Sequence, residues 1–188
     1  MEHLTGHNSE GYKKLPDDVL NLLAELKAPQ RLIAHLTLVH DTALTLTDML
    51  NKLFPKLNFD RNTVLYGAAL HDIGKTIITA ELSAPGSLHE EAGYHLLRER
   101  GIDERVALLA RDHSNWENNS RTENLLAALA DNLWKGKRVP VLESLILEKI
   151  LIDSGEERWV VFMALDEAFE QIASTADERI GYQFSYHI

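Results

Sequence analysis

Apolar residues recur at helical spacing along most of the chain, and the alternation typical of strands is almost absent. The longest apolar stripe has intervals of four and three residues. Its members are Leu32, Leu36, Val39, Ala43, Leu46 and Leu50. Such a stripe is one face of a long helix, which we expect to end at Pro55. The pattern predicts an all-α fold.

The other apolar segments are separated by residues that break helices. A second helix is expected to begin at Asp60, which would cap it, and to stop at Gly74. Residues 81–86 contain serine, proline and glycine and predict a loop. Ser87 and Glu90 then have the spacing of a capping box for the next helix. Further helices are expected at 105–113, 123–134, 141–153 and 156–176.

The composition narrows the class of protein. The 188-residue chain is 45% hydrophobic, which allows one sizeable core and favours a single domain. Cysteine is absent, so disulfides and thiolate ligands are excluded, and any metal must bind nitrogen and oxygen atoms. We find neither a secretory signal nor an apolar stretch of about 18 residues, so we expect a cytoplasmic protein that does not enter a membrane.

The charge of the chain bears on its partners. A formal net charge of −10 opposes binding to polyanions, so duplex nucleic acid is not an expected partner. A small anionic substrate would need a local group of cations. Lys135, Lys137 and Arg138 form such a group, although a short basic run is by itself more typical of a solvated loop.

The strongest chemical signal is His71 followed by Asp72, directly after the apolar segment 64–70. A buried helix that ends in an imidazole and a carboxylate contains two polar groups whose desolvation must be offset. Metal coordination or dense hydrogen bonding can offset it, and we favour metal coordination. Lys75 follows closely and could serve the same site, or it could simply complement the helix dipole.

Other candidate ligands lie on separate helices. They are His35 or His40, His89, His113 and Asp131. Side chains that converge from several helices are a standard way to build a metal site in a bundle. At about 100° per residue, His35 and His40 point about 140° apart, so a straight helix cannot direct both to one metal. Asp131 could alternatively pair with a cation such as Arg111.

The order His, His-Asp, His, His, Asp along successive helices resembles the HD-domain superfamily of metal-dependent phosphohydrolases. The segments that carry the resemblance are Arg31-x3-His35-x3-Val39-x3-Ala43, His71-Asp72-Ile73-Gly74-Lys75, His89-Glu90-Glu91-Ala92-Gly93 and Leu129-Ala130-Asp131-Asn132-Leu133. The first segment favours His35 over His40. The resemblance covers about residues 29–138 and implies a single-domain HD-type helical bundle. It leaves an N-terminal extension and first helix at 1–28, and additional C-terminal helices at 139–188 packed on the same core.

The resemblance also implies roles for the candidate residues. One metal would have four ligands and a second would have two, with the Asp72 carboxylate bridging them. The expected metal ligands are His35, His71, Asp72, His89, His113 and Asp131, the catalytic residues are Asp72, His71 and Lys75, and the substrate-binding residues are Lys135, Lys137 and Arg138. Members with two metals often carry a second histidine at the position of Ser114.

Nitrogen and oxygen ligands suit one or two divalent transition ions, namely Mn, Fe, Co, Ni or Zn, and do not choose among them. The implied reaction is hydrolysis of a phosphoester of a small soluble substrate, and a nucleotide is the favoured class. Within the superfamily, similar ligands also serve mixed-valence di-iron oxygenases. A metal-containing module that senses a nucleotide is a third interpretation. The sequence does not identify the substrate or the oligomeric state.

Overall fold

The computed structural model describes residues 11–117 and 120–186, which contain helices and no strand. In chain order the elements are α1 (Asp17–Glu25), α2 (Gln30–Leu53), α3 (Arg61–Leu70), the 3-10 helices η1 (Ile73–Thr76) and η2 (Thr79–Leu82), α4 (Leu88–Glu99), α5 (Glu104–Asp112), α6 (Thr122–Leu133), α7 (Pro140–Ser154), α8 (Arg158–Ala173) and α9 (Ala176–Phe184). The predicted all-α fold is confirmed. Within these ranges, no helix combines the length and apolar composition that a membrane crossing requires.

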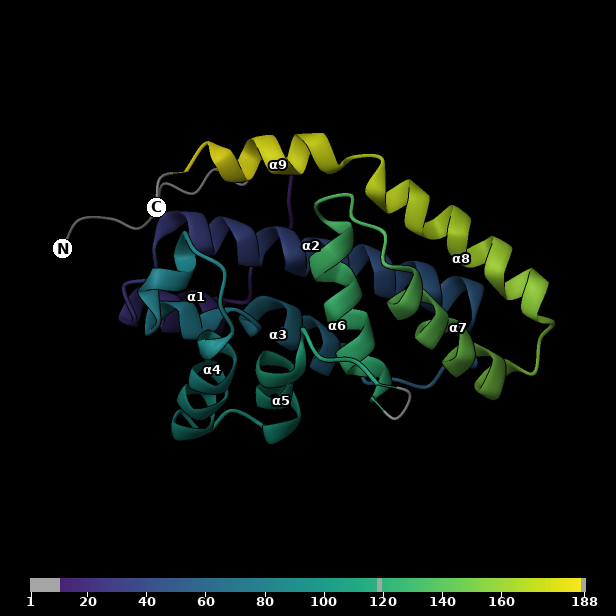
Figure 1. The fold of residues 1–188 in the computed structure, drawn as a ribbon, viewed down its shortest axis with the longest axis horizontal. Coiled ribbons are helices and arrows are strands. Elements are labelled where there is room, and N and C mark those ends of the chain that lie inside the picture. The colour runs from purple at the N-terminus through teal and green to yellow at the C-terminus, as the bar shows by residue number, and fades with distance from the viewer. Residues whose placement is uncertain (1–10, 118–119, 187–188) are drawn as a thin grey trace.

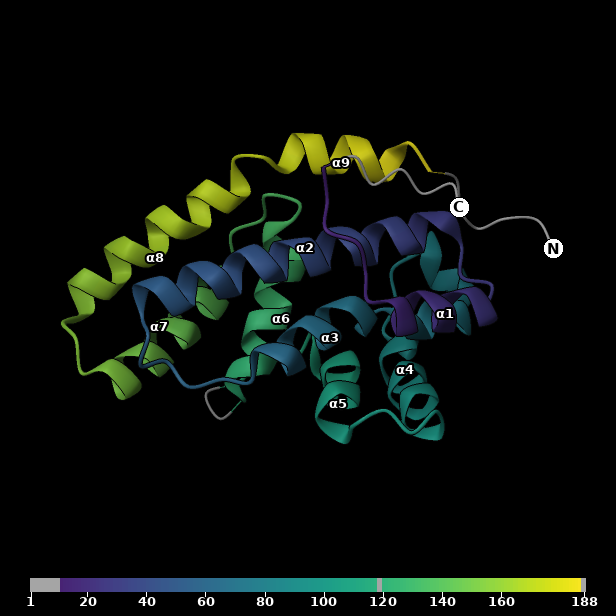
Figure 2. The same cartoon turned by 180° about the vertical axis from the view of Figure 1, so that it is seen from behind.

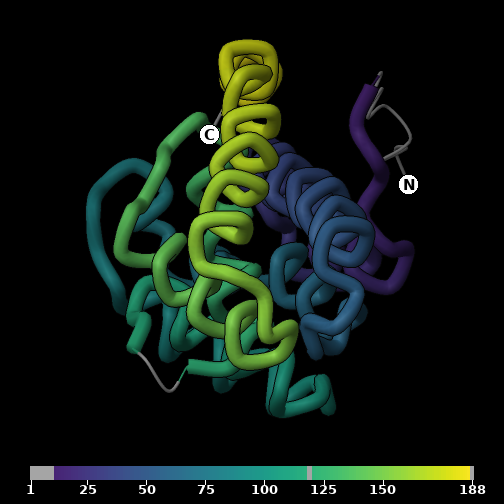
Figure 3. The backbone as a smooth tube through the Cα atoms, turned by 90° about the vertical axis from the view of Figure 1, so that its right-hand side faces the viewer, coloured from purple at the N-terminus to yellow at the C-terminus, as the bar shows by residue number. Residues whose placement is uncertain are grey.

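The long helix α2 runs through the middle of the molecule (Figures 1 and 2). All residues of the stripe predicted from the sequence are buried on it. Helices α3 and α6 pack against α2, while α9 lies along its first half and α8 along its second half. In the end-on view, α8 and α9 follow one another along one edge of the molecule (Figure 3). Burial on several sides therefore stabilises α2.

Two clusters of buried apolar side chains fill the interior. One cluster joins the second half of α2 to α6, α7 and α8, and it includes Leu46 and Phe169. The other joins α1, the first half of α2, α4 and α5, and it includes Leu36 and Leu97. Helices α2 and α3 contribute to both clusters. These two helices therefore fix the two halves of the interior relative to each other.

Helix α3 begins where the sequence predicted and ends earlier. Asp60 caps it, because the Asp60 Oδ1 accepts the backbone N–H of Thr63 at 3.2 Å. The last helical residue is Leu70, so the predicted stop at Gly74 is wrong. Residues 71–72 instead turn the chain into η1, which packs against α4. The packing of η1 on α4 therefore takes precedence over the local sequence preference for extending α3 to Gly74.

The start of α4 also differs from the prediction. Ser87 makes no capping hydrogen bond, so the predicted capping box with Glu90 is wrong. The carboxylate of Glu81, on η2, caps the helix instead. It accepts the backbone N–H of Leu88 at 3.0 Å and that of His89 at 3.1 Å. The cap therefore comes from outside the helix, and part of the predicted loop is a 3-10 helix.

The helix predicted at 156–176 is α8, and the chain then turns into a further helix, α9, which the sequence analysis did not predict. Buried Arg179 holds α9 in place. Its guanidinium donates to the carbonyl oxygen of Trp134 at 2.6 Å and to that of Leu133 at 3.1 Å. These bonds satisfy carbonyl groups at the end of α6. As a result, the last helix of the chain is fixed beside the end of α6 and the beginning of α2.

The low pKa of His40 predicts that the free energy of unfolding falls as the pH is lowered. Burial, assisted by the charge of Arg61, lowers the pKa of His40 from 6.5 to about 4. The unfolded chain therefore binds a proton at His40 before the folded chain does, and folding weakens as the pH falls. From about pH 7 to about pH 4.5, His40 should lower the free energy of unfolding by about 2 kcal/mol.

The comparison that isolates this effect is His40→Leu, which removes the titrating group and keeps an apolar side chain of similar size. Denaturant unfolding of both proteins in chelator would give the two pH profiles. We expect the variant to lose about 2 kcal/mol less on acidification than the wild type. Parallel profiles would show that His40 does not stay neutral in the folded protein.

Candidate metal centre

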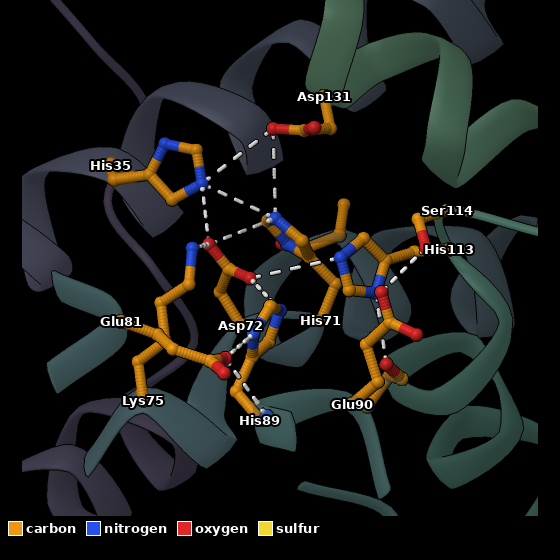
Figure 4. Close-up of polar contacts among 12 residues, drawn as sticks. His35, His71, Asp72, Lys75, Glu81, His89, Glu90, His113, Ser114 and Asp131 are labelled. Atoms are coloured by element: carbon orange, nitrogen blue, oxygen red, sulfur yellow. Dashed lines mark hydrogen bonds and ion pairs between the residues drawn. The ribbon is translucent and has the colours of Figure 1, made fainter. Parts of the chain in front are cut away.

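Six side chains from separate parts of the fold meet at one place (Figure 4). His35 is on α2, His71 and Asp72 are in the turn after α3, His89 is in the first turn of α4, His113 follows α5 and Asp131 is in the last turn of α6. They form two groups, and within each the ligand atoms lie within 4.8 Å of one another. The groups are His35 with His71 and Asp131, and Asp72 with His89 and His113. The structure thus brings together all the residues that the sequence proposed as metal ligands.

In the first group, three ligand atoms surround one point. The Nε2 atoms of His35 and His71 are 3.2 Å apart, and each is 3.6 Å from the Oδ1 of Asp131. Ligands held about 2.1 Å from a tetrahedral or octahedral metal are separated by roughly 3.0–3.4 Å. The spacing of this group therefore fits a single divalent ion.

Asp72 connects the two groups through its two oxygen atoms. Its Oδ2 is 3.2 Å from the Nε2 of His35. Its Oδ1 is 3.0 Å from the Nε2 of His89 and 3.7 Å from the Nε2 of His113. One oxygen therefore faces each group, which is the arrangement of a bridging carboxylate. Figure 4 shows Asp72 in the middle of the ring of imidazoles.

The far nitrogen of several imidazoles is occupied, which aims the near nitrogen at the centre. The Nδ1 of His71 lies 2.9 Å from the carbonyl oxygen of Ala68, and the Nδ1 of His113 lies 2.9 Å from that of Ala110. Partners of this kind fix the tautomer and orientation of histidines that bind metals. The buried Nε2 of His89 makes no hydrogen bond of good geometry within the described part of the chain, although the Oδ1 of Asp72 lies 3.0 Å away. A metal ion would satisfy it.

The protonation states also suit a metal. Burial would raise the pKa of the Asp72 carboxyl, but the charge of His71 and contacts with His35 and His89 hold it well below its usual range. Burial lowers the pKa of the imidazoles of His35 and His113. In His71 and His89 burial is outweighed, chiefly by the carboxylate of Asp72, which raises the pKa, so a metal ion that binds there would displace protons. Ionised carboxylates and neutral imidazoles are the forms that bind metals. The six side chains therefore fit one or two divalent ions.

Asp131 is enclosed by neutral and positive groups. Burial would raise its pKa, but the imidazole of His71 and the charge of Lys135 hold the pKa below its usual range. Its Oδ1 also accepts the indole N–H of Trp134 at 3.2 Å. Arg111, the other partner considered for Asp131, instead forms an ion pair with the adjacent Asp112.

Glu81 belongs to the centre and was missed by the sequence reasoning. Its Oε2 lies 2.5 Å from the Nδ1 of His89, in addition to capping the first turn of α4. This carboxylate packs tightly on Gly86, where an added Cβ would lie 2.1 Å from the Glu81 Oε1. No local motif identifies Glu81, because its partners lie beyond a turn whose path the sequence does not show.

Gly74 allows η1 to approach α4. An added Cβ would lie 2.0 Å from the carbonyl oxygen of His89 and 2.6 Å from the backbone nitrogen of Gly93. Both neighbours are backbone atoms, which cannot move aside as a flexible side chain can. Gly74 therefore holds the turn that carries His71 and Asp72 against the first turn of α4.

The cations proposed from the sequence lie in different places. The Nζ of Lys75 donates to the Oδ2 of Asp72 at 2.6 Å, and the Nζ of Lys135 lies 3.4 Å from the Oδ2 of Asp131. Lys137 is exposed and does not line the cavity at the centre. Arg138 also lies off this cavity, in ion pairs with Glu143, Asp166 and Glu170. The structure therefore places one member of the 135–138 group, Lys135, at the centre.

A cavity of about 340 Å³ opens over the two groups. Apart from the candidate ligands, its lining includes Arg31, Lys75, Glu90, Ser114, Lys135 and Gln183. The Ser114 hydroxyl donates to the Glu90 carboxylate at 2.5 Å. The cavity therefore gives a small molecule access to the centre.

Comparison with known proteins identifies the family. The HD domain matches residues 32–135, so the chain belongs to the HD domain family, whose members are generally metal-dependent hydrolases that bind divalent metals. Over 152 residues the chain is 30% identical to a tRNA (cytidine(56)-2'-O)-methyltransferase of Thermoplasma volcanium. The alignment covers 71% of this chain and 41% of that relative, so the chain spans about two fifths of the relative's length. No solved structure matches significantly.

Glu81→Gln tests the support of His89. A glutamine amide cannot reproduce both the cap and the acceptor for the imidazole, so His89 should lose its fixed orientation. We expect the affinity for the more weakly held metal to fall about 10- to 100-fold, measured by competition with a chelator. Glu91→Gln is the matched control, because Glu91 is exposed on the same helix and pairs with His95. Equal affinities in both variants would show that Glu81 does not support the centre.

Gly74→Ala tests the close packing of the turn on α4. The new methyl group would force two backbones apart, which should lower the free energy of unfolding by about 1–3 kcal/mol and reduce bound metal. Denaturant unfolding and metal analysis would measure the two effects. The control is Gly181→Ala on α9, where a Cβ meets no atom within 4 Å. A Gly74→Ala protein with wild-type stability would contradict the packing described above.

Proposed function

We propose that this protein is a metal-dependent phosphohydrolase that cleaves a phosphoester of a small soluble substrate, with a nucleotide as the favoured class. The observation that supports it best is the position of Asp72, with one oxygen toward each group of candidate ligands. Two divalent transition ions, drawn from Mn, Fe, Co, Ni and Zn, would suit these nitrogen and oxygen ligands. His35, His71, Asp72 and Asp131 would hold one ion, and Asp72, His89 and His113 would hold the other.

The residues of the chain would prepare the site for hydrolysis. When bound, the ions supply an acidified water as nucleophile and positive charge for the phosphoryl oxygens. Lys75 keeps a positive charge at the wall of the cavity through its contact with Asp72, and Lys135 does the same beside Asp131. Glu81 and the carbonyl oxygen of Ala68 orient the imidazoles of His89 and His71.

The charge around the cavity supports an anionic substrate. Apart from the candidate ligands, the described lining contains the cations Arg31, Lys75 and Lys135 and one carboxylate, Glu90. This balance is the reverse of the net charge of −10 of the whole chain. A concentration of one sign of charge in a concave site attracts ligands of the opposite sign. The volume of about 340 Å³ lies near the lower end of small-molecule sites, which supports a small substrate.

Two alternatives would use the same side chains. A mixed-valence di-iron oxygenase would share the ligands, but the cations of the lining favour a phosphorylated substrate. A nucleotide-sensing module would not require a complete set of ligands, and none of the six is replaced here. The tRNA in the name of the relative belongs to a protein more than twice as long as the aligned region, and the acidic charge of this chain opposes RNA binding.

The first test is metal content and phosphate release in wild type and Asp72→Ala. Wild-type protein purified without chelator should carry about two ions per chain and release phosphate from nucleotides in the presence of Mn²⁺. Asp72→Ala should lose most of the metal and all detectable turnover while its helical circular dichroism persists. Two irons with oxygen-dependent spectral changes and no phosphate release would favour the oxygenase. Turnover by metal-free Asp72→Ala would disprove the proposed site.

His35→Ala and His40→Ala form a matched pair on α2. Both residues are buried, but only His35 contributes to a candidate metal group within the described residues. His35→Ala should therefore lower the metal content, while His40→Ala should change mainly stability. The reverse ranking, read from metal content per chain, would exclude His35 as the ligand on this helix.

A further inference from the structure

Arg31 is at the mouth of the cavity, one helical turn before His35 on α2. Its guanidinium carbon lies 4.7 Å from the centre of the Phe184 ring, which is on α9. This distance is typical of a cation–π contact. Phe184 is 64% exposed, a costly position for a phenyl ring. The contact with Arg31 gives the exposed ring a structural role, which is to hold the guanidinium at the entrance.

Arg31 contacts an aromatic ring, whereas the other cations of the cavity contact carboxylates. Lys75 and Lys135 are each bonded to the carboxylate of a candidate metal ligand. Arg31 forms no ion pair with a carboxylate among the residues that the structure describes, although acidic residues number 29 in the chain against 19 basic ones. A guanidinium held in place and left without an anionic partner is suited to bind an anion from solution.

The arrangement around Arg31 joins the first segment of the family resemblance to the last helix of the chain. Arg31 directly precedes the matched residues 32–135 and begins the segment that resembles the family, whereas Phe184 on α9 lies well outside that range. Helix α9 reaches this place because Arg179 bonds it to the end of α6, and the neighbouring Gln183 lines the same cavity. Figures 1 and 2 show α9 lying along the first half of α2. The entrance therefore combines Arg31 with a helix from outside the matched domain.

We propose that Arg31, held by Phe184, binds a second phosphoryl group of the substrate, so that the preferred substrate carries at least two phosphoryl groups. This inference rests on the proposed phosphohydrolase function. One helical turn, about 6 Å, separates the Cα atoms of Arg31 and His35 along α2. A phosphoryl group at the metal ligands and a second one attached to it can therefore be held at once. The planar guanidinium can donate two parallel hydrogen bonds to such a group.

The test compares two ligands that cannot be hydrolysed, methylphosphonate and methylenediphosphonate. Calorimetric titration would measure the affinity of each for the Mn²⁺-loaded protein, dialysed free of excess metal. For the wild type we expect the diphosphonate to bind at least about tenfold more tightly than the monophosphonate, as one additional charge-assisted contact would produce. A wild type that binds both ligands equally well would overturn the proposal.

Variants at the entrance test whether Arg31 causes the difference. Arg31→Met should reduce the preference for the diphosphonate to less than about threefold. Phe184→Leu should reduce it partly, and Phe184→Trp should retain it because indole also supports a cation–π contact. Lys52→Met is the control, since it removes one positive charge from the far end of the same helix. A preference that survives in Arg31→Met, or that falls equally in Lys52→Met, would overturn the proposal.

Hydrolysis of p-nitrophenyl phosphate with Mn²⁺ separates this inference from the proposed function, because that substrate carries a single phosphoryl group. Turnover of this substrate together with no preference for the diphosphonate would overturn the role of Arg31 alone. An absence of turnover and of binding to either phosphonate would overturn the proposed function and this inference with it.

Discussion

The burial of the Asp72 carboxylate is the constraint on which the rest of the structure depends. Only 3% of the residue is exposed, and an ionised carboxylate in such a place is strongly destabilising without nearby compensation. The compensation comes from His35, His89 and Lys75, which arrive from different elements. Three parts of the chain must therefore be positioned accurately around one side chain, and the two apolar clusters that share α2 and α3 provide that positioning.

The centre and its entrance have different origins in the chain. All six candidate ligands lie within residues 32–135, the segment that defines the HD domain family. The wall of the cavity also includes Arg31, directly before that segment, and Gln183 of α9, which lies outside it. The candidate ligands therefore come from the family segment, while α9 adds to the cavity a wall from outside that segment. Arg179 connects the two, because it bonds the last helix to the end of α6, next to Asp131.

The sequence predicted those features that depend on local pattern. The apolar stripe of α2 and the cap at Asp60 follow from spacing and residue type alone, and the order of histidines and aspartates indicated which side chains meet. Features that depend on distant partners were not predictable. Glu81 reaches His89 across a turn, and Arg138, which resembled a phosphate-binding residue, pairs with Asp166 far along the chain. Helix α9 was also not predicted, because it is held by the bonds of Arg179 to the distant end of α6.

The carboxylate of Glu81 both caps α4 and contacts the imidazole of His89, using the same oxygen atoms. It accepts the backbone amides of Leu88 and His89, and it also contacts the His89 imidazole. A movement of this imidazole would therefore shift Glu81 and change its hydrogen bonds to the backbone amides at the start of α4. Binding of an ion at the centre and the ordering of η2 are therefore thermodynamically linked, because both depend on the contacts of the two Glu81 oxygen atoms. The hydrogen-exchange rates of those two amides would then report, from a distance, whether the centre is filled.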